Sequence, residues 1–134
     1  FGALADGDSR QLLDDLAAIT SLGLPVKVIV ESGRLEAEAL ELLVEVSLDA
    51  GVRFLKSGSG FGPPVSVAQV QRLRQLARGR AGIKASGGIN NLELALDLVE
   101  AGAARLGTSR GVALMEALRR GPQRHPPGPE GPLA

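Results

Sequence analysis

A short apolar strand followed by a helix recurs along this chain, and no other sequence feature limits the fold as strongly. Strands are predicted at 26–30, 52–56, 82–85 and 104–107, so that successive strands start 22 to 30 residues apart. Helical spacing of apolar residues predicts helices over 8–21, 35–49, 67–78, 91–101 and 110–120. Buried strands that alternate with helices predict a parallel sheet. Two architectures satisfy this pattern: an open doubly wound sheet, or a (β/α)8 barrel, of which the four units here would be about half.

The last segment of the chain differs from the rest in composition. Residues 121–134 contain five Pro and three Gly, which predicts a disordered tail after a domain that spans residues 1–120. The single histidine, His125, lies in this tail. We expect it to be solvated and to take no part in catalysis.

Composition excludes several classes of protein. Fifteen basic and 15 acidic residues balance, and Cys, Trp and Tyr are absent. The chain therefore has no disulfide framework, cysteine zinc site or thiol nucleophile, and it does not resemble a dedicated nucleic-acid binder. No apolar run is long enough to span a membrane, and no signal peptide is visible, so we expect a cytoplasmic location.

The basic residues are unevenly chosen, with 12 Arg and only three Lys. Lys27, Lys56 and Lys84 each fall inside a predicted strand. Strand alternation places the neighbouring valines toward the helices, so that Lys27 and Glu31 point to the other face, into a barrel. Lys56 and Lys84 lie on successive strands and are expected to be neighbours. A buried amine either lowers its pKa or finds a partner, and a neutral amine forms a Schiff base with a carbonyl. The alternative is that each lysine extends from a strand end into solvent.

Glycine-rich turns follow the last two strands. Ser86-Gly87-Gly88 and Gly107-Thr108-Ser109 each end a strand and precede a helix. Glycine lets the backbone approach an anion, and free N–H groups at a helix start bind it, so both turns are candidate phosphate-binding loops. They could equally be ordinary tight turns. The Gly- and Pro-rich loop at 57–64, after the Lys56 strand, is either substrate-facing or a simple connection.

Taken together, these motifs resemble one enzyme family. The segment from Phe54 to Gly62, reading Phe-Leu-Lys-Ser-Gly-Ser-Gly-Phe-Gly, resembles the Schiff-base lysine segment of the deoxyribose-phosphate aldolases. The segment Lys84-Ala-Ser-Gly-Gly-Ile89 resembles the family's second-lysine strand. Residues 26–33 and 105–109 resemble the strands on either side. The resemblance extends from Phe1 to about Leu118, which is nearly everything except the tail.

The resemblance implies a class I aldolase on a (β/α)8 (TIM) barrel that needs no metal and no other cofactor. Such an enzyme reversibly cleaves a small phosphosugar, 2-deoxy-D-ribose 5-phosphate, to acetaldehyde and glyceraldehyde 3-phosphate. Lys56 would be the nucleophile that forms the imine, Lys84 would keep it unprotonated and help to transfer protons, and Lys27 would support them from a polar network beneath. The implied phosphate-binding residues are Gly87, Gly88, Gly107 and Ser109.

The chain also departs from the family pattern. Ser57 stands where the family usually has Thr, and Arg110 stands where it usually has Ser. The family's catalytic aspartate belongs to a strand before the segment that matches residues 1–4, and Asp6 and Asp8 are not its equivalents. The chain is therefore expected to be the C-terminal half of the barrel, strands five to eight, with weak or no activity by itself. Two alternatives stay open: a non-catalytic half-barrel that binds phosphate ligands and self-associates into a homo-oligomer, and another phosphate-binding barrel enzyme.

Overall fold

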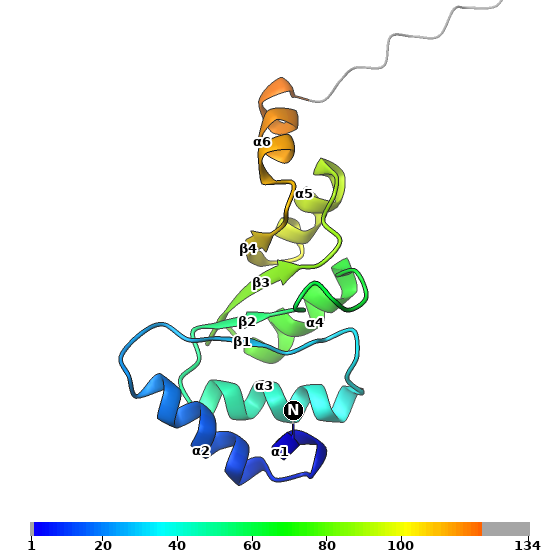
Figure 1. Cartoon of the computed structure of the whole chain (residues 1–134). Coiled ribbons are helices and arrows are strands. Elements are labelled where there is room, and N and C mark those ends of the chain that lie inside the picture. Colours follow the sequence, from blue (N-terminus) through cyan, green and yellow to red (C-terminus); the bar gives the residue numbers. More distant parts are fainter. Residues whose placement is uncertain (1, 122–134) are drawn as a thin grey trace, which may run out of the picture.

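The computed structural model describes residues 2–121, which form six helices and four strands. The predicted tail from residue 122 onward, with His125, lies outside the described residues. Helices and strands alternate from residue 27 to residue 120, as the repeat predicts (Figure 1). In chain order the elements are α1 (Gly2–Ala5), α2 (Ser9–Thr20), β1 (Lys27–Ile29), α3 (Ala37–Asp49), β2 (Phe54–Lys56), α4 (Val67–Ala77), β3 (Gly82–Ser86), α5 (Leu92–Glu100), β4 (Ala103–Gly107) and α6 (Gly111–Arg120).

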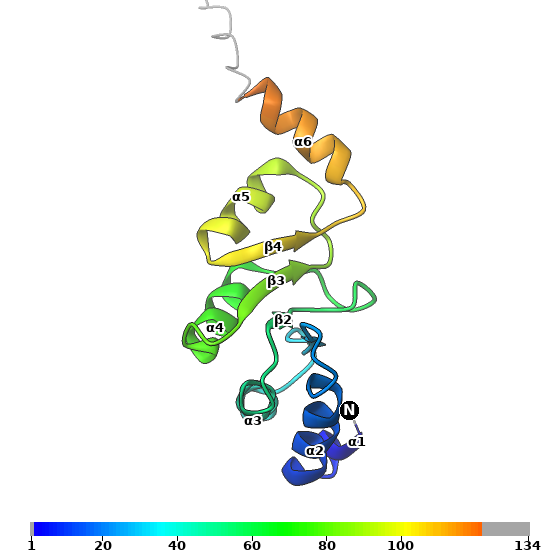
Figure 2. The ribbon, with the colours of Figure 1, turned by 90° about the vertical axis from the view of Figure 1, so that its left-hand side faces the viewer.

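The four strands form one parallel sheet in the order β1-β2-β3-β4. Each strand therefore lies beside the next one in sequence, and the order never reverses. Right-handed crossovers between strands in such an order place the connecting helices on the same face of the sheet. Figure 2 shows α3, α4 and α5 along one face of the strands. This arrangement is that of half a (β/α)8 barrel and differs from a doubly wound sheet, which carries helices on both faces.

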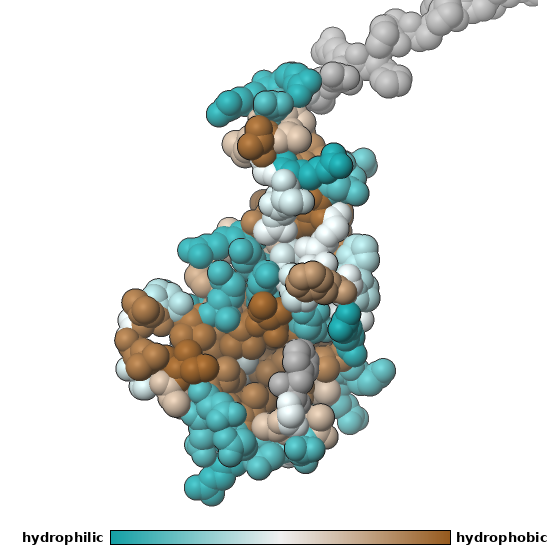
Figure 3. All heavy atoms as spheres, in the orientation of Figure 1, coloured by the Kyte–Doolittle hydropathy of each residue, from teal (hydrophilic) through white to brown (hydrophobic). Residues whose placement is uncertain are grey.

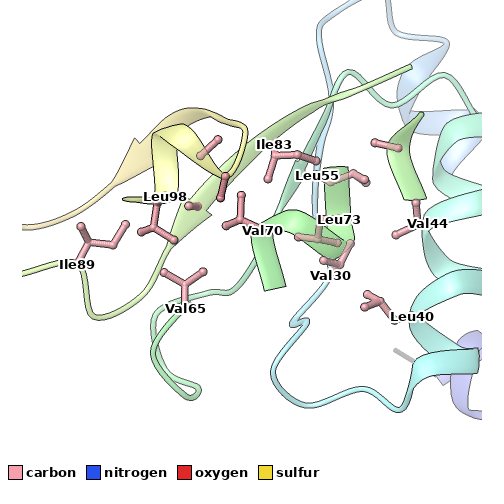
Figure 4. Packing of buried hydrophobic residues seen from close by; sticks show 14 of the residues in the cluster. Val30, Leu40, Val44, Leu55, Val65, Val70, Leu73, Ile83, Ile89 and Leu98 are labelled. Atoms are coloured by element: carbon pink, nitrogen blue, oxygen red, sulfur yellow. The ribbon is translucent and has the colours of Figure 1, made fainter. Parts of the chain in front are cut away.

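The hydrophobic core lies between the sheet and these helices. Alternate strand residues point into it, and Val30, Leu55 and Ala85 are fully buried there. Leu73 of α4 and Leu98 of α5 meet them from the helix side, also with no exposed surface (Figure 4). The prediction that the valines of the first strand face the helices is confirmed for Val30, and Val28 packs partly against the same core.

Side-chain caps explain where three of the helices begin. Asp8 accepts a hydrogen bond from the backbone N–H of Gln11 and caps α2. Ser66 and Gln69 form a reciprocal capping box at the start of α4, and Asn91 caps α5. The predicted second strand starts two residues late, at Phe54, because the Val52 N–H is bonded to the Ser47 carbonyl at the end of α3. The short helix α1 was not predicted.

The other face of the sheet is open in the described residues. Lys27 and Arg105 are exposed there, and Ile29 leaves 41% of its surface accessible. Leu22 and Leu24, in the connection from α2 to β1, are 77% and 76% exposed, and apolar surface gathers over this region (Figure 3). Both outer strands, β1 and β4, have one unpaired edge within the sheet. None of the helices in residues 2–121 has both the length and the apolar character to cross a membrane.

Candidate active site

A pocket of about 390 Å³ opens where the strands β2, β3 and β4 end and their following loops begin. The carboxyl end of a parallel sheet is where barrel enzymes place their active sites. The pocket contains both amines of the predicted lysine pair together with both glycine-rich turns. Its lining comprises Lys56, Ser59, Gly60, Lys84, Ser86, Gly87, Gly88, Ile89, Asn90, Gly107, Thr108, Ser109 and Arg110.

The lysine pair is brought together by strand register. Lys56, the last residue of β2, is the direct partner of Lys84 on β3, and both side chains are half-buried. The prediction that these two lysines are neighbours is confirmed. Lys27 lies within β1, also as predicted, but its register partner is Phe54, two residues before Lys56. Lys27 is exposed and does not line the pocket.

Gly107 makes room for the second lysine. A Cβ atom at this position would lie 2.9 Å from Lys84 Cε and 3.0 Å from Ser86 Cβ. Real Cβ atoms essentially never approach other heavy atoms this closely, so any larger residue would displace the Lys84 side chain. The sequence pattern predicted Gly107 as a phosphate-loop residue, and the structure adds this steric role.

The two glycine-rich turns meet at one side of the pocket. Gly87 and Gly88 have φ values of +108° and +70°, which L side chains rarely adopt. Gly88 also lies tightly against Pro64, because a Cβ there would come within 2.7 Å of the proline Cβ. The Thr108 hydroxyl donates a hydrogen bond of 2.7 Å to the Ile89 carbonyl and links the turns. The four candidate phosphate-binding residues, Gly87, Gly88, Gly107 and Ser109, therefore line a single pocket.

Two buried serines, which the motifs did not single out as a pair, lock the ends of β2 and β3 together. The Ser57 hydroxyl donates to the Ser86 carbonyl at 3.1 Å and accepts from the Ser86 N–H at 3.0 Å. The Ser86 hydroxyl donates to the Gly58 carbonyl at 2.6 Å. Ser57 directly follows β2, and Ser86 is the last residue of β3. Each serine therefore lies at the end of a strand that carries a lysine of the pair, and this position in the sequence could have identified both. Their bonds hold the two lysine strands in one register.

Glu31 has an unexpected environment. We predicted that it points into the barrel beside Lys27, yet it is 8% exposed and its carboxylate contacts the loop after β2. Its φ of +47° lies in the left-handed region, which costs a non-glycine residue roughly 1 to 2 kcal/mol. Hydrogen bonding to the Ser59 side chain holds the pKa of the Glu31 carboxyl below its ordinary value, although burial opposes the shift. The charges of Arg34 and Lys56 lower this pKa further.

The arrangement suits a carbonyl substrate that carries an anionic group. Two amines face one pocket, hydroxyl groups lie beside them, and backbone N–H groups at glycine turns and at the start of α6 are available for an anion. Arg110 adds a positive charge at the same rim. Asp6 and Asp8 do not line the pocket, and Asp8 is engaged as the α2 cap. Within residues 2–121, no three His, Cys, Asp or Glu side chains cluster in a way that could hold a metal ion.

Comparison with known proteins places this geometry in context. No family model matches the chain. A deoxyribose-phosphate aldolase from Thermosynechococcus vestitus is 47% identical over 117 residues, which are 87% of this chain and 54% of that protein. The deoxyribose-phosphate aldolase from Microcystis aeruginosa is 46% identical over 86% of this chain and 52% of its own length. The chain thus spans about half the length of the curated relatives that it matches.

Solved structures give the same correspondence. The aldolase QR15 superimposes with a TM-score of 0.83 at 34% identity, over 89% of this chain and 55% of that one. The tetrameric deoxyribose phosphate aldolase from Aeropyrum pernix superimposes with a TM-score of 0.73, also at 34% identity, over 85% of this chain and 50% of its own. The four-stranded sheet with its helices is therefore half of an aldolase-type TIM barrel, as expected.

Proposed function

Because the chain is homologous to about half of a deoxyribose-phosphate aldolase, we propose that it carries the Schiff-base half of that enzyme's active site. The reaction is the reversible cleavage of 2-deoxy-D-ribose 5-phosphate to acetaldehyde and glyceraldehyde 3-phosphate. The observation that carries this proposal is the register pairing of Lys56 with Lys84 inside one pocket. We assign residues 1–120 to this partial barrel domain.

In the proposed mechanism, the Lys56 amine attacks the aldehyde carbon of the open-chain sugar, and loss of water leaves an iminium. Loss of the proton from the C3 hydroxyl then breaks the C2–C3 bond, whose electron pair moves into the iminium to leave an enamine, and glyceraldehyde 3-phosphate is released. Protonation of the resulting enamine, followed by addition of water, releases acetaldehyde and returns the free amine. Lys84, the register partner of Lys56, lies beside the imine and relays protons.

The substrate phosphate would bind at the two glycine-rich turns. Gly87, Gly88, Gly107 and Ser109 share the pocket with the lysines, and their loops precede the helices α5 and α6. Free backbone N–H groups at such turns bind anions. A phosphosugar held there would present its aldehyde end to the lysine pair. We also propose that the protein acts in the cytoplasm, in the degradation of deoxyribonucleotides and carbohydrates.

Reductive trapping tests the nucleophile directly. We expect that acetaldehyde and sodium borohydride leave an ethyl group on Lys56, because hydride reduces the imine carbon to a stable secondary amine. Peptide mass spectrometry locates the adduct. Lys56→Arg should abolish the adduct, since a guanidinium does not form an imine under these conditions. Lys27→Arg, which changes an exposed strand lysine outside the pocket, is the control and should leave the Lys56 adduct in place. The absence of an adduct on Lys56, or an equal adduct in the Lys56→Arg variant, would contradict the assignment.

One observation favours a second function, a phosphate-binding half-barrel that self-associates without catalysis. Among residues 2–121 the sheet leaves one edge of β1 and one edge of β4 unpaired, and its inner face exposes Ile29. Unpaired edges pair readily with other strands. Light scattering after size-exclusion chromatography should then give a discrete dimer, with phosphate binding retained in the Lys56→Arg variant. A monomer or a polydisperse aggregate contradicts this second function.

A further inference from the structure

The loop that follows the Lys56 strand is built into the pocket. Residues 57–62, here called the lysine loop, form the first part of the connection from β2 to α4. Ser59 and Gly60 of this loop line the same cavity as Lys56 and Lys84. The sequence left open whether this loop faces a substrate or merely connects two elements. Its position in the pocket raises the question of what holds it there, since three of its six residues are glycines.

The segment after β1 supplies most of the anchors. The Ser32 N–H donates to the Ser57 carbonyl at 2.8 Å, and the Ser32 hydroxyl reaches the same oxygen at 3.2 Å. Further along the loop, the Ser59 N–H donates to Glu31 Oε1 at 2.7 Å. The Arg34 guanidinium donates to the Phe61 carbonyl at 3.0 Å. Residues 31–34 therefore hold the loop at its start, middle and end.

Glu31 is the central anchor because its carboxylate is enclosed by the loop. The Oε2 atom lies so close to Gly58 and Gly62 that a Cβ on either glycine would come within 3.6 Å and 3.1 Å of it. A larger residue at Gly62 would therefore crowd the carboxylate, whereas a Cβ at Gly58 would make an ordinary van der Waals contact with it. A hydrogen bond from an N–H group to a charged carboxylate is also stronger than one to a neutral acceptor.

The backbone conformation of Glu31 also indicates that the surrounding structure holds this residue in place. A glutamate held at a φ of +47° is strained, and such strain persists where the surrounding structure fixes the residue. The residue that bears this strain is also the only buried carboxylate among residues 2–121. The charge of Lys56 also lowers the pKa of the Glu31 carboxyl, which links the anchor to the proposed nucleophile.

We propose that Glu31 is a positioning residue, whose carboxylate holds the lysine loop in place through the Ser59 N–H so that Ser59 and Gly60 close the pocket beside Lys56. Glu31 does not touch the reacting atoms and acts through the loop. This inference rests on the proposed function for its catalytic consequence, whereas the anchoring of the loop does not depend on it.

The test uses the whole chain and the variant Glu31→Gln, which keeps the side-chain size but removes the charge. Glu36→Gln is the matched control, because Glu36 lies in the same connection and is exposed. Hydrogen–deuterium exchange should be at least tenfold faster across residues 57–62 in the Glu31 variant and unchanged in the control. The maximal rate of borohydride trapping at saturating acetaldehyde should fall at least tenfold, with the helix content seen by circular dichroism retained.

A second variant keeps the test decisive if Glu31→Gln does not fold. Glu31→Asp retains the buried charge but is one methylene too short to reach the Ser59 N–H, so it should show the same faster exchange and slower trapping. Unchanged exchange in the folded variants, or faster exchange with an unchanged trapping rate, would overturn the proposal. If the unaltered chain itself gives no Lys56 adduct, the proposed function fails, while the exchange experiment still decides whether Glu31 anchors the loop.

Discussion

Replacing Gly88 with alanine should destabilise the fold through a contact that the structure defines. Gly88 has a φ of +70°, and a Cβ there would lie 2.7 Å from Pro64 Cβ and 3.3 Å from Pro64 Cα. The proline ring and backbone have little freedom to move away. Gly79 provides a matched comparison, since its φ is +76° and a Cβ there would meet nothing within 4 Å.

The comparison separates backbone strain from crowding. Alanine in the left-handed region costs roughly 1 to 2 kcal/mol, and it recovers about 0.4 to 1 kcal/mol by reducing the entropy of the unfolded chain. Both variants share these two contributions. Only Gly88→Ala adds the cost of overpacking, which is typically about 1 to 3 kcal/mol. We therefore expect Gly88→Ala to lower the free energy of unfolding by about 1 to 3 kcal/mol more than Gly79→Ala does.

Urea denaturation followed by circular dichroism measures both free energies. The double variant Pro64→Gly/Gly88→Ala should recover most of the difference, because removal of the Pro64 ring takes away the nearest atoms. Equal losses for Gly88→Ala and Gly79→Ala, or no recovery in the double variant, would refute the assignment of the cost to the Pro64 contact.

Three further changes test other parts of the fold. The pKa of Glu31 is lowered in the folded state, so its contribution to stability is complete above the ordinary glutamate pKa of about 4.3 and is lost as the pH falls through the folded value. Glu31→Gln should therefore weaken the fall of the free energy of unfolding in acid, as measured by urea titrations at several pH values. Leu73→Ala, at a fully buried core position, should cost about 2 to 5 kcal/mol in the same assay, and a loss below 1 kcal/mol would contradict its place in the core. Ser66→Ala removes half of the α4 capping box and should cost about 1 kcal/mol, whereas Ser66→Asp, which keeps an acceptor, should cost less.

Much of the fold followed from local patterns. The short apolar strands and the helical spacing of the segments between them were enough to predict every strand and five of the six helices in residues 2–121. Boundaries were less accurate, because they depend on individual hydrogen bonds such as that from the Val52 N–H to Ser47. The helix α1 was missed because four residues are too few for a hydrophobic period to appear.

The site was predictable where the repeat itself places residues together. Lys56 and Lys84 occupy equivalent positions on successive strands, so parallel pairing had to bring them close. Lys27 differs by two residues in register, and this difference separates it from the pair. The Glu31 anchor was misplaced because strand alternation was extended past the end of β1, where the chain turns into the left-handed region.

The sequence by itself determined the βα repeat and the lysine pair, because both follow from periodicity along the chain. Only the tertiary structure decided that Glu31 turns back to the lysine loop, that Ser57 and Ser86 join two strands, and that Gly88 must fit against Pro64. These contacts join residues that are 24 to 29 positions apart in the chain. The geometry of these contacts depends on how neighbouring βα units stack. A local sequence pattern carries no information about contacts between residues so far apart in the chain.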